Sequence, residues 1–110
     1  MLNQQTRRDP QPAISVQIDE SLKDLIPGFL ENRKKDVEKI RLALEQADFS
    51  VIQTLGHRMK GDGGGYGFDG IGEIGAALEL AAARRDCESI HRQLAKLADY
   101  LDRIHITYVS

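Results

Sequence analysis

Apolar residues recur at the spacing of an α-helix along most of this 110-residue chain. They fall into four segments, each of which would place its apolar side chains on one face of a helix. The positions are Phe29, Leu30, Val37, Ile40 and Leu44, then Ile52, Leu55 and Met59, then Ile71, Ile74, Leu78 and Ala82, and finally Ile90, Leu94, Leu97, Leu101 and Ile104. Only a few residues separate neighbouring segments, so successive helices should pack antiparallel. The sequence therefore predicts an all-α fold, an antiparallel up-down four-helix bundle preceded by a short N-terminal helix.

Cap residues predict where the four long helices begin. Pro27 suits the first turn of the first helix, because that turn needs no N–H from it, and we expect this helix to end near Gln46. Asp48, Asp69 and Asp86 are placed to cap the next three helices. A carboxylate at that position can accept hydrogen bonds from the free N–H groups of the first turn.

The N-terminal part of the chain has a different pattern. Residues 1–12 are polar and are predicted to be a disordered leader, and residues 13–110 are predicted to form one domain. Apolar and polar residues alternate over 13–18, as in a strand. No second strand pattern is evident to pair with it, so we expect an extended segment that lies on the domain. Asp19 would then cap the short helix, which would run through Ile26.

Composition excludes several classes of protein. The net charge is −2, so no overall field attracts the chain to nucleic acid or to an anionic membrane. No apolar run has the length of a membrane span, and the N-terminus has no apolar signal core. The single cysteine, Cys87, rules out an internal disulfide framework and fits a reducing compartment. We therefore expect a cytoplasmic monomer that binds neither nucleic acid nor membrane.

The helix predicted to begin at Phe49 carries a histidine on its solvent face. At about 100° per residue, His57 lies about 160° from the core residue Met59, so it points away from the apolar stripe. Five residues share this outer surface and its flank: Gln53, His57, Lys60, Gly61 and Gly64. They combine a nucleophile, a nearby cation and two positions without side chains, where a partner could come close. This surface could hold a phosphoryl group and pass it on.

Glycine is unusually frequent directly after this histidine. Five glycines lie between positions 61 and 67, and each costs about 1 kcal/mol relative to alanine inside a helix. Propensity alone would end the helix at Lys60. However, Tyr66 keeps the phase of the apolar stripe, and packing at Gly63 could offset part of the cost. We predict that the helix continues to about Gly65 or Tyr66.

These residues resemble the motif of the histidine-containing phosphotransfer (HPt) family, which is roughly His-x-Leu/Met-Lys-Gly, then small residues, then an aromatic or apolar residue and Gly. The matching residues are His57, Met59, Lys60, Gly61, Gly64, Tyr66 and Gly67. Asp48-Phe49 before the motif and Leu78-Glu79 after it also resemble the family. The resemblance covers about residues 19–105. Asp62 departs from the motif, since serine is more usual there, and it places a negative charge near the site.

The resemblance implies a phosphorelay intermediate with His57 as the phospho-acceptor and Lys60 as the residue that stabilises the phosphoryl charge. Gly61 and Gly64 would let the docked partner approach, and we expect Gln53, on the same flank as His57, to contact it as well. The implied partners are receiver domains of hybrid histidine kinases or of response regulators, which exchange phosphoryl groups between aspartate and histidine. The chain would be a phospho-carrier without an ATP-binding kinase domain. It would need no cofactor, since Mg²⁺ would be held by the receiver, and it would contain no metal site.

Other features have simpler interpretations. His91 and His105 have no cysteine or histidine partner at metal-ligand spacing. The run Gly63–Gly65 follows no strand and is not closed by Gly-Lys-Ser/Thr, so it is a poor candidate for a phosphate-binding loop. The basic cluster 33–35 precedes acidic residues and is more typical of a solvated helix face than of a nucleic-acid site.

Two other functions compete with the phospho-carrier. One is a non-catalytic helical adaptor that docks receiver domains without transfer, but His57 and Lys60 argue against it. The other is an enzyme that binds a nucleotide at the glycine-rich segment, but no nucleotide fold or pair of carboxylates accompanies that segment. Acid-labile, base-stable label after incubation with a phosphorylated receiver would distinguish the first function from both.

Overall fold

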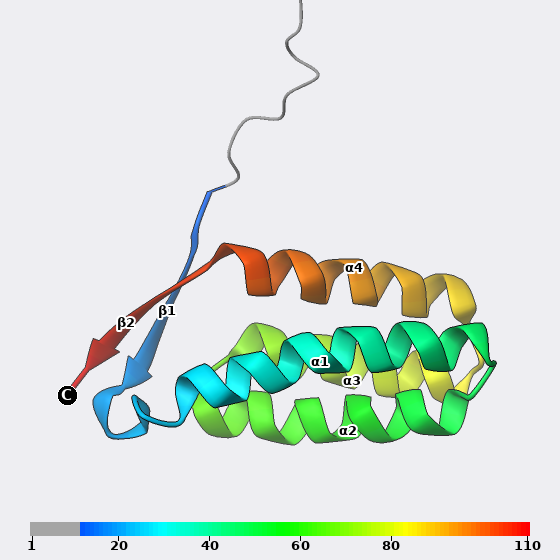
Figure 1. Ribbon diagram of the computed structural model, residues 1–110, viewed down its shortest axis with the longest axis horizontal. Coiled ribbons are helices and arrows are strands. Elements are labelled where there is room, and N and C mark those ends of the chain that lie inside the picture. Colours follow the sequence, from blue (N-terminus) through cyan, green and yellow to red (C-terminus); the bar gives the residue numbers. More distant parts are fainter. Residues whose placement is uncertain (1–11) are drawn as a thin grey trace, which may run out of the picture.

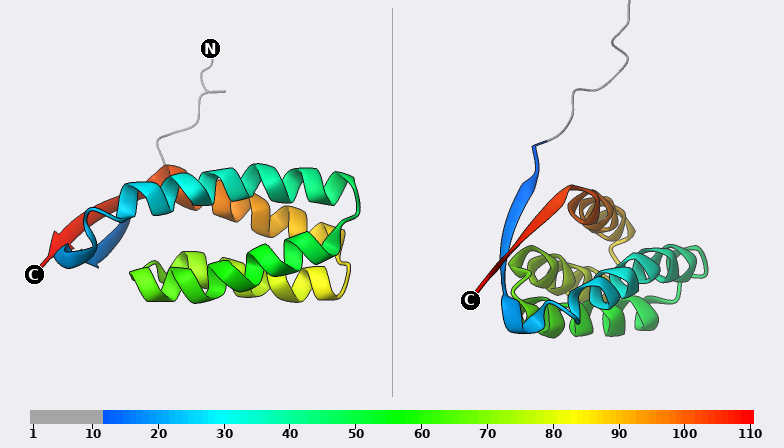
Figure 2. Two further views of the ribbon diagram at one scale, coloured as in Figure 1. Left: turned by 60° about the horizontal axis from the view of Figure 1, so that its bottom comes forward. Right: turned by 60° about the vertical axis from the view of Figure 1, so that its left-hand side comes forward.

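A computed structural model describes residues 12–110 of the chain. These residues form four helices, a short 3-10 turn and two strands: β1 (Ile14–Asp19), the turn Glu20–Leu22, α1 (Ile26–Glu45), α2 (Phe49–Tyr66), α3 (Asp69–Ala83), α4 (Cys87–Arg103) and β2 (Ile104–Val109). The helices lie side by side, with the α1–α2 and α3–α4 connections at one end and both strands at the other (Figures 1 and 2). No helix in the described range is both long enough and apolar enough to cross a membrane.

Most helix ends agree with the predictions from cap residues. The Asp48 carboxylate accepts a hydrogen bond from the Val51 N–H at 3.3 Å, and the Asp86 carboxylate accepts one from the Ser89 N–H at 3.1 Å. The prediction for Asp69 is wrong. The fully buried Phe68 occupies the N-cap position, and Asp69 is the first residue of α3. There its negative charge still interacts favourably with the positive end of the helix dipole.

The described residues are mostly helical, as the predicted all-α bundle requires, but two strands add a small parallel sheet that was not predicted. β1 pairs with β2 in parallel over six residue pairs, from Ile14 with Ile104 to Asp19 with Val109. The prediction that β1 has no partner is therefore wrong, as is the placement of Ile104 in the last helix. Ile104 is extended (φ −67°, ψ 140°), and beyond it apolar and polar residues alternate in exposure. The alternation turns the apolar side of β2 toward the bundle.

The predicted short N-terminal helix is also shorter in the structure than expected. Asp19 does act as a cap, since its carboxylate accepts from the Ser21 N–H at 2.9 Å, and this bond lowers the pKa of Asp19. However, only a three-residue 3-10 turn follows it, and Ile26 already belongs to α1. Pro27 stands in the first turn of α1, as predicted, where its missing N–H costs nothing.

The glycine-rich end of α2 remains helical as far as Tyr66, which confirms the prediction made from the apolar phase. The Tyr66 ring packs against the Phe29 ring of α1, with ring centroids 4.5 Å apart. The Phe68 ring also stacks on Phe29, with a centroid separation of 5.4 Å. Gly67 ends the helix with φ 92°, a conformation that other residues rarely adopt. Its neighbour Ile18 is 1% exposed. The glycine-rich residues 61–66 have low helix propensity, and packing against aromatic rings and against Ile18 of β1 keeps them helical.

Candidate functional site

His57 lies near the middle of α2 with its side chain 67% exposed. Met59, two residues away on the same helix, is fully buried. The structure therefore places His57 on the solvent face, as the helical phase predicts. Because α2 is anchored by its buried stripe, the backbone under His57 is fixed while the imidazole remains accessible to a partner.

One carboxylate bridges His57 and Lys60, two residues of the predicted site. Glu79 of α3 lies with Oε2 2.9 Å from His57 Nδ1 and with Oε1 3.0 Å from Lys60 Nζ. The hydrogen bond to Lys60, and then that to His57, lower the pKa of Glu79 below its usual range. An ionised carboxylate can only accept hydrogen bonds, so Nδ1 of His57 is the donor. Within residues 12–110, Nε2 has no hydrogen-bond partner. The site is thus a His57–Glu79–Lys60 triad.

The triad depends on a close approach of α2 and α3 at two glycines. A Cβ atom on Gly56 would lie 2.7 Å from the backbone N of Glu79, and one on Gly75 would lie 2.6 Å from the backbone N of Lys60. Real Cβ atoms do not come this near to backbone atoms, so both positions require glycine. The contact brings Glu79 within reach of His57 and Lys60.

The glycines after Lys60 serve two different purposes. A Cβ on Gly63 would lie 2.5 Å from the backbone N of Gly72 in α3, so Gly63 belongs to the helix contact. At Gly61, Gly64 and Gly65, by contrast, an added Cβ would meet no described atom within 4 Å apart from its chain neighbours and the backbone of its own helix. These three glycines leave a surface without side chains beside His57.

A shallow hollow of about 270 Å³ lies on the other side of His57. It is lined by Ser50, Gln53, Thr54, His57 and Glu79. Gln53, which sequence analysis placed near the docking surface, therefore does adjoin His57. The surface around His57 therefore has no side chains on the side of the glycines and polar side chains on the side of the hollow.

Asp62, the departure from the HPt motif, faces away from this site. Its carboxylate lies 3.7 Å from the Arg33 guanidinium of α1, which also contacts Asp36 at 2.9 Å. Burial raises the pKa of Asp36, and the Arg33 charge opposes this effect. The negative charge of Asp62 is thus paired with α1, on the opposite flank of α2 from Glu79.

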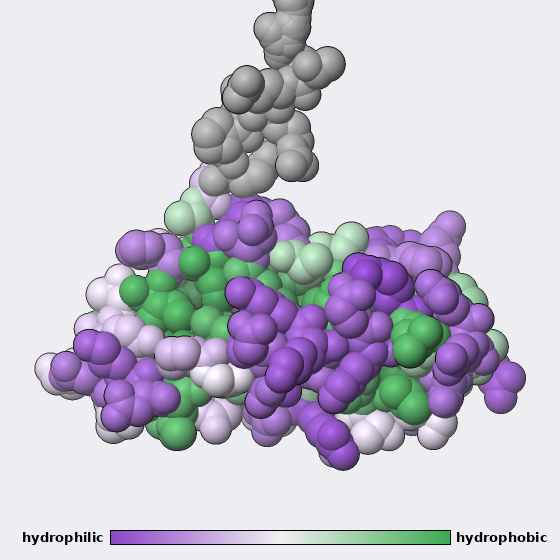
Figure 3. All heavy atoms as spheres, viewed as in Figure 1, coloured by the Kyte–Doolittle hydropathy of each residue, from purple (hydrophilic) through white to green (hydrophobic). Residues whose placement is uncertain are grey.

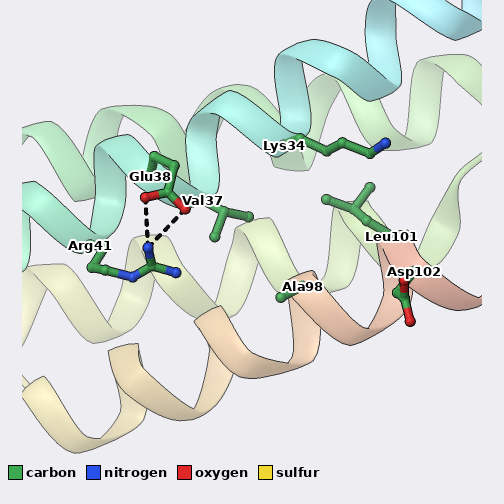
Figure 4. A pocket seen from close by; sticks show the side chains of 7 residues that line it. All are labelled: Lys34, Val37, Glu38, Arg41, Ala98, Leu101 and Asp102. Atoms are coloured by element: carbon green, nitrogen blue, oxygen red, sulfur yellow. Dashed lines mark hydrogen bonds and ion pairs between the residues drawn. The ribbon is translucent and has the colours of Figure 1, made fainter.

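A larger hollow than the one beside His57 lies elsewhere, between α1 and α4. It has a volume of about 480 Å³ and is lined by apolar and charged side chains of both helices: Lys34, Val37, Glu38, Arg41, Ala98, Leu101 and Asp102 (Figure 4). Figure 3 shows hydrophilic residues along α1 and apolar residues in the gap toward α4. None of the predicted site residues lines this hollow. Within residues 12–110, no group of three or more His, Cys, Asp or Glu side chains is arranged to hold a metal ion.

Sequence analysis missed the role of Glu79. It noted Leu78-Glu79 only as part of the resemblance and gave the carboxylate no function. Helical phase predicts which face of one helix a residue occupies, but it does not predict which residue of another helix it meets. The available signal was the pair of glycines, Gly56 and Gly75, since small residues at both positions permit close packing of α2 on α3.

Comparison with known families agrees with this site. The model of the Hpt domain matches residues 24–105, which include all four helices and leave β1 and most of β2 outside. The chain belongs to the Hpt domain family, whose members are phospho-carriers of phosphorelays rather than kinases. No curated protein and no solved structure matches the chain.

Proposed function

We propose that this protein is a phosphorelay intermediate that accepts a phosphoryl group on His57 from a receiver-domain aspartate and passes it to another receiver aspartate. The observation that carries the proposal is the exposed His57, whose Nδ1 is engaged by Glu79 and whose Nε2 meets no partner in the described part of the chain. Membership of the Hpt family supports a role in histidine phosphotransfer. The lone Cys87 fits a reducing compartment, which supports a cytoplasmic location for the relay.

The proposed transfer needs little chemistry from the protein itself. Nε2 of His57 attacks the phosphorus of an aspartyl phosphate, an N–P bond forms, and the P–O bond to the aspartate breaks. The carboxylate leaves with the electron pair and stays on the receiver. Such transfers depend mainly on alignment and on neutralising the charge of the phosphoryl oxygens. Lys60 is proposed to supply positive charge from this chain, and the receiver is proposed to supply Mg²⁺.

The surface beside His57 suits a receiver whose active-site loops must come close. Gly61, Gly64 and Gly65 have no side chains and face open space, so a partner backbone could approach the histidine from that side. Gln53 in the polar hollow offers hydrogen bonds on the other side. We propose that these two surfaces flank His57 in the docked complex and bring Nε2 into line with the aspartyl phosphate.

A transfer assay tests the proposal. The chain is incubated with a phosphorylated receiver and Mg²⁺, and the label is then tested for loss in acid and retention in base. We expect acid-labile, base-stable label on the unmodified chain and on His91→Gln, which alters another exposed histidine. His57→Gln should remain folded and accept no label. Label that persists in His57→Gln, or that is lost in His91→Gln, would contradict the assignment.

A further inference from the structure

We propose that Asp62 is a specificity-determining residue, which selects receivers that place an arginine or lysine side chain in the groove between α1 and α2. This inference rests on the proposed function of His57 and adds to it the chemistry of the preferred partner. Asp62 stands where the HPt motif more usually has serine, so its carboxylate is a feature of this chain rather than of the motif. Selection here means tighter docking of the receiver, with the chemistry of transfer unchanged.

Asp62 lies at the edge of the surface that a docked receiver would cover. At about 100° per residue, Gly61, Gly65 and Asp62 follow His57 around α2 in the same sense, at roughly 40°, 80° and 140°. Asp62 is also only about 7.5 Å beyond His57 along the helix axis. A standard protein interface buries about 800 Å² of each partner, a patch roughly 30 Å across. A receiver centred on His57 therefore reaches Asp62, although Asp62 does not contact the triad.

A hollow of about 340 Å³ adjoins Asp62 in the groove between α1 and α2. It is open to a side chain from outside, since Leu25 on its wall is 53% exposed. Its lining combines apolar groups, a side-chain amide and a carboxylate: Leu25, Gly28, Phe29, Asn32, Arg33, Asp62 and Tyr66. A long basic side chain has the matching chemistry, because its stem is apolar and its tip is charged.

The ion pairs in this groove leave the Asp62 carboxylate available to a partner. Arg33 lies 2.9 Å from Asp36 but 3.7 Å from Asp62, which is too far for a direct hydrogen bond. The Asp62 side chain is 54% exposed, whereas that of Arg33 is 12% exposed. A receiver side chain that enters the hollow therefore meets the carboxylate of Asp62 more readily than the guanidinium of Arg33.

The other charges near the groove act on Asp36, which is buried. Burial raises the pKa of Asp36, and the charges of Arg33, Lys39 and Arg58 oppose this effect. Arg58 lies one turn before Asp62 on α2, but the two form no ion pair in the described part of the chain. An acidic receiver side chain at the hollow would be repelled by Asp62, and such repulsion is an effective way to exclude wrong partners.

The first test measures transfer to the chain over a series of receiver concentrations, at low and at high salt. The receiver is the one that labels the unmodified chain fastest among those of the source organism. Asp62→Asn removes the charge and keeps the size, and Asp102→Asn makes the same change at an exposed position of α4. We expect Asp62→Asn to raise the half-saturating receiver concentration about fivefold at low salt and to keep the maximal rate.

Two comparisons separate this effect from a general change in charge or stability. Asp102→Asn should alter neither the half-saturating concentration nor the maximal rate. The effect of Asp62→Asn should shrink at high salt, because exposed charges are then screened. Urea denaturation and circular dichroism check that both variants are folded and equally stable.

The second test exchanges the charges across the interface. Asp62→Lys is combined with receiver variants in which each exposed arginine or lysine is replaced in turn by glutamate. One receiver variant should dock poorly on the unmodified chain and regain affinity for Asp62→Lys. Such a recovery identifies the partner side chain, since non-additive effects of two substitutions indicate that the residues interact.

The possible failures can be told apart. If no phosphorylated receiver labels His57 in the unmodified chain, the proposed function is wrong and this inference falls with it. If His57 is labelled but Asp62→Asn keeps the same half-saturating concentration, or lowers only the maximal rate, the role of Asp62 is overturned. The absence of recovery in every charge exchange would also overturn it. If Asp62→Asn changes the sedimentation of the chain alone, the hollow is a contact between two copies and the proposal is wrong.

Discussion

Gly56 of α2 and Gly75 of α3 face each other so closely that neither position has room for a methyl group. A Cβ on Gly56 would lie 2.8 Å from the carbonyl oxygen of Gly75, and a Cβ on Gly75 would lie 2.7 Å from that of Gly56. The triad of His57, Glu79 and Lys60 is built across this contact. Helix packing and site geometry therefore depend on the same two residues.

Gly75→Ala should destabilise the protein and disrupt the triad. The new methyl group would overlap Met59 and the backbone of Lys60, and overpacking of this kind costs about 1–3 kcal/mol. The gain in helix propensity returns only about 1 kcal/mol. Urea denaturation measures the change. Gly61→Ala is the matched control, because it faces open space and should leave stability equal or higher. Equal stability changes in the two variants would contradict this account of the helix contact.

Gly64→Leu should keep or raise thermal stability and weaken transfer sharply. Apart from its chain neighbours and the backbone of its own helix, no described atom lies within 4 Å of a Cβ at this position, so a larger side chain has room in the free protein and helix propensity improves. In the proposed complex the same side chain would stand between the receiver and His57. Thermal melts and the transfer rate are measured together. Full transfer activity in a stable Gly64→Leu variant would show that the receiver does not approach across this surface.

Lys60→Ala should fold normally but accept phosphate more slowly or retain it less well. The Lys60 side chain is about half exposed, so its ion pair with Glu79 contributes less than about 1 kcal/mol to the fold. Its charge should matter more when a phosphoryl group arrives beside it. The rate of transfer and the lifetime of phospho-His57 are compared at low salt, where screening is weakest. If both equal those of the unmodified chain, Lys60 does not stabilise the phosphoryl charge.

Ile18→Ala should loosen the glycine-rich end of α2 although it lies on a strand. Ile18 is 1% exposed and its Cδ1 would lie 3.2 Å from a Cβ on Gly67, the cap of the helix. Removing a buried isoleucine side chain costs about 2–5 kcal/mol. Hydrogen exchange should therefore quicken over residues 61–66 before it quickens over 49–56. Gln17→Ala, at an exposed position of the same strand, should change neither the stability of the protein nor hydrogen exchange over residues 61–66. If protection from exchange is lost uniformly along α2, packing of β1 does not stabilise residues 61–66 specifically.

The starts of α2 and α4 and the orientation of His57 could be predicted from the sequence because both depend on nearby residues. Caps such as Asp48 and Asp86 bond within their own first turn. The phase of Ile52 and Met59 decides which way His57 points, since the angle per residue is constant along a helix. The same phase predicted that α2 reaches Tyr66. Asp69 failed as a cap because burial of Phe68 decided where α3 begins.

The tertiary structure decided the features that join distant parts of the chain. The pairing of residues 14–19 with 104–109 depends on two segments that meet only when the bundle forms, and neither segment indicates its partner in its own pattern. Which glycines pack against α3 and which face open space depends on what lies opposite each one. Gly63 meets the backbone of α3 and Gly64 meets open space, though the two are adjacent in sequence. The contact of His57 with Glu79 arises in the same way, because helical periodicity fixes the face of each helix while the packing of α2 on α3 selects which side chains touch.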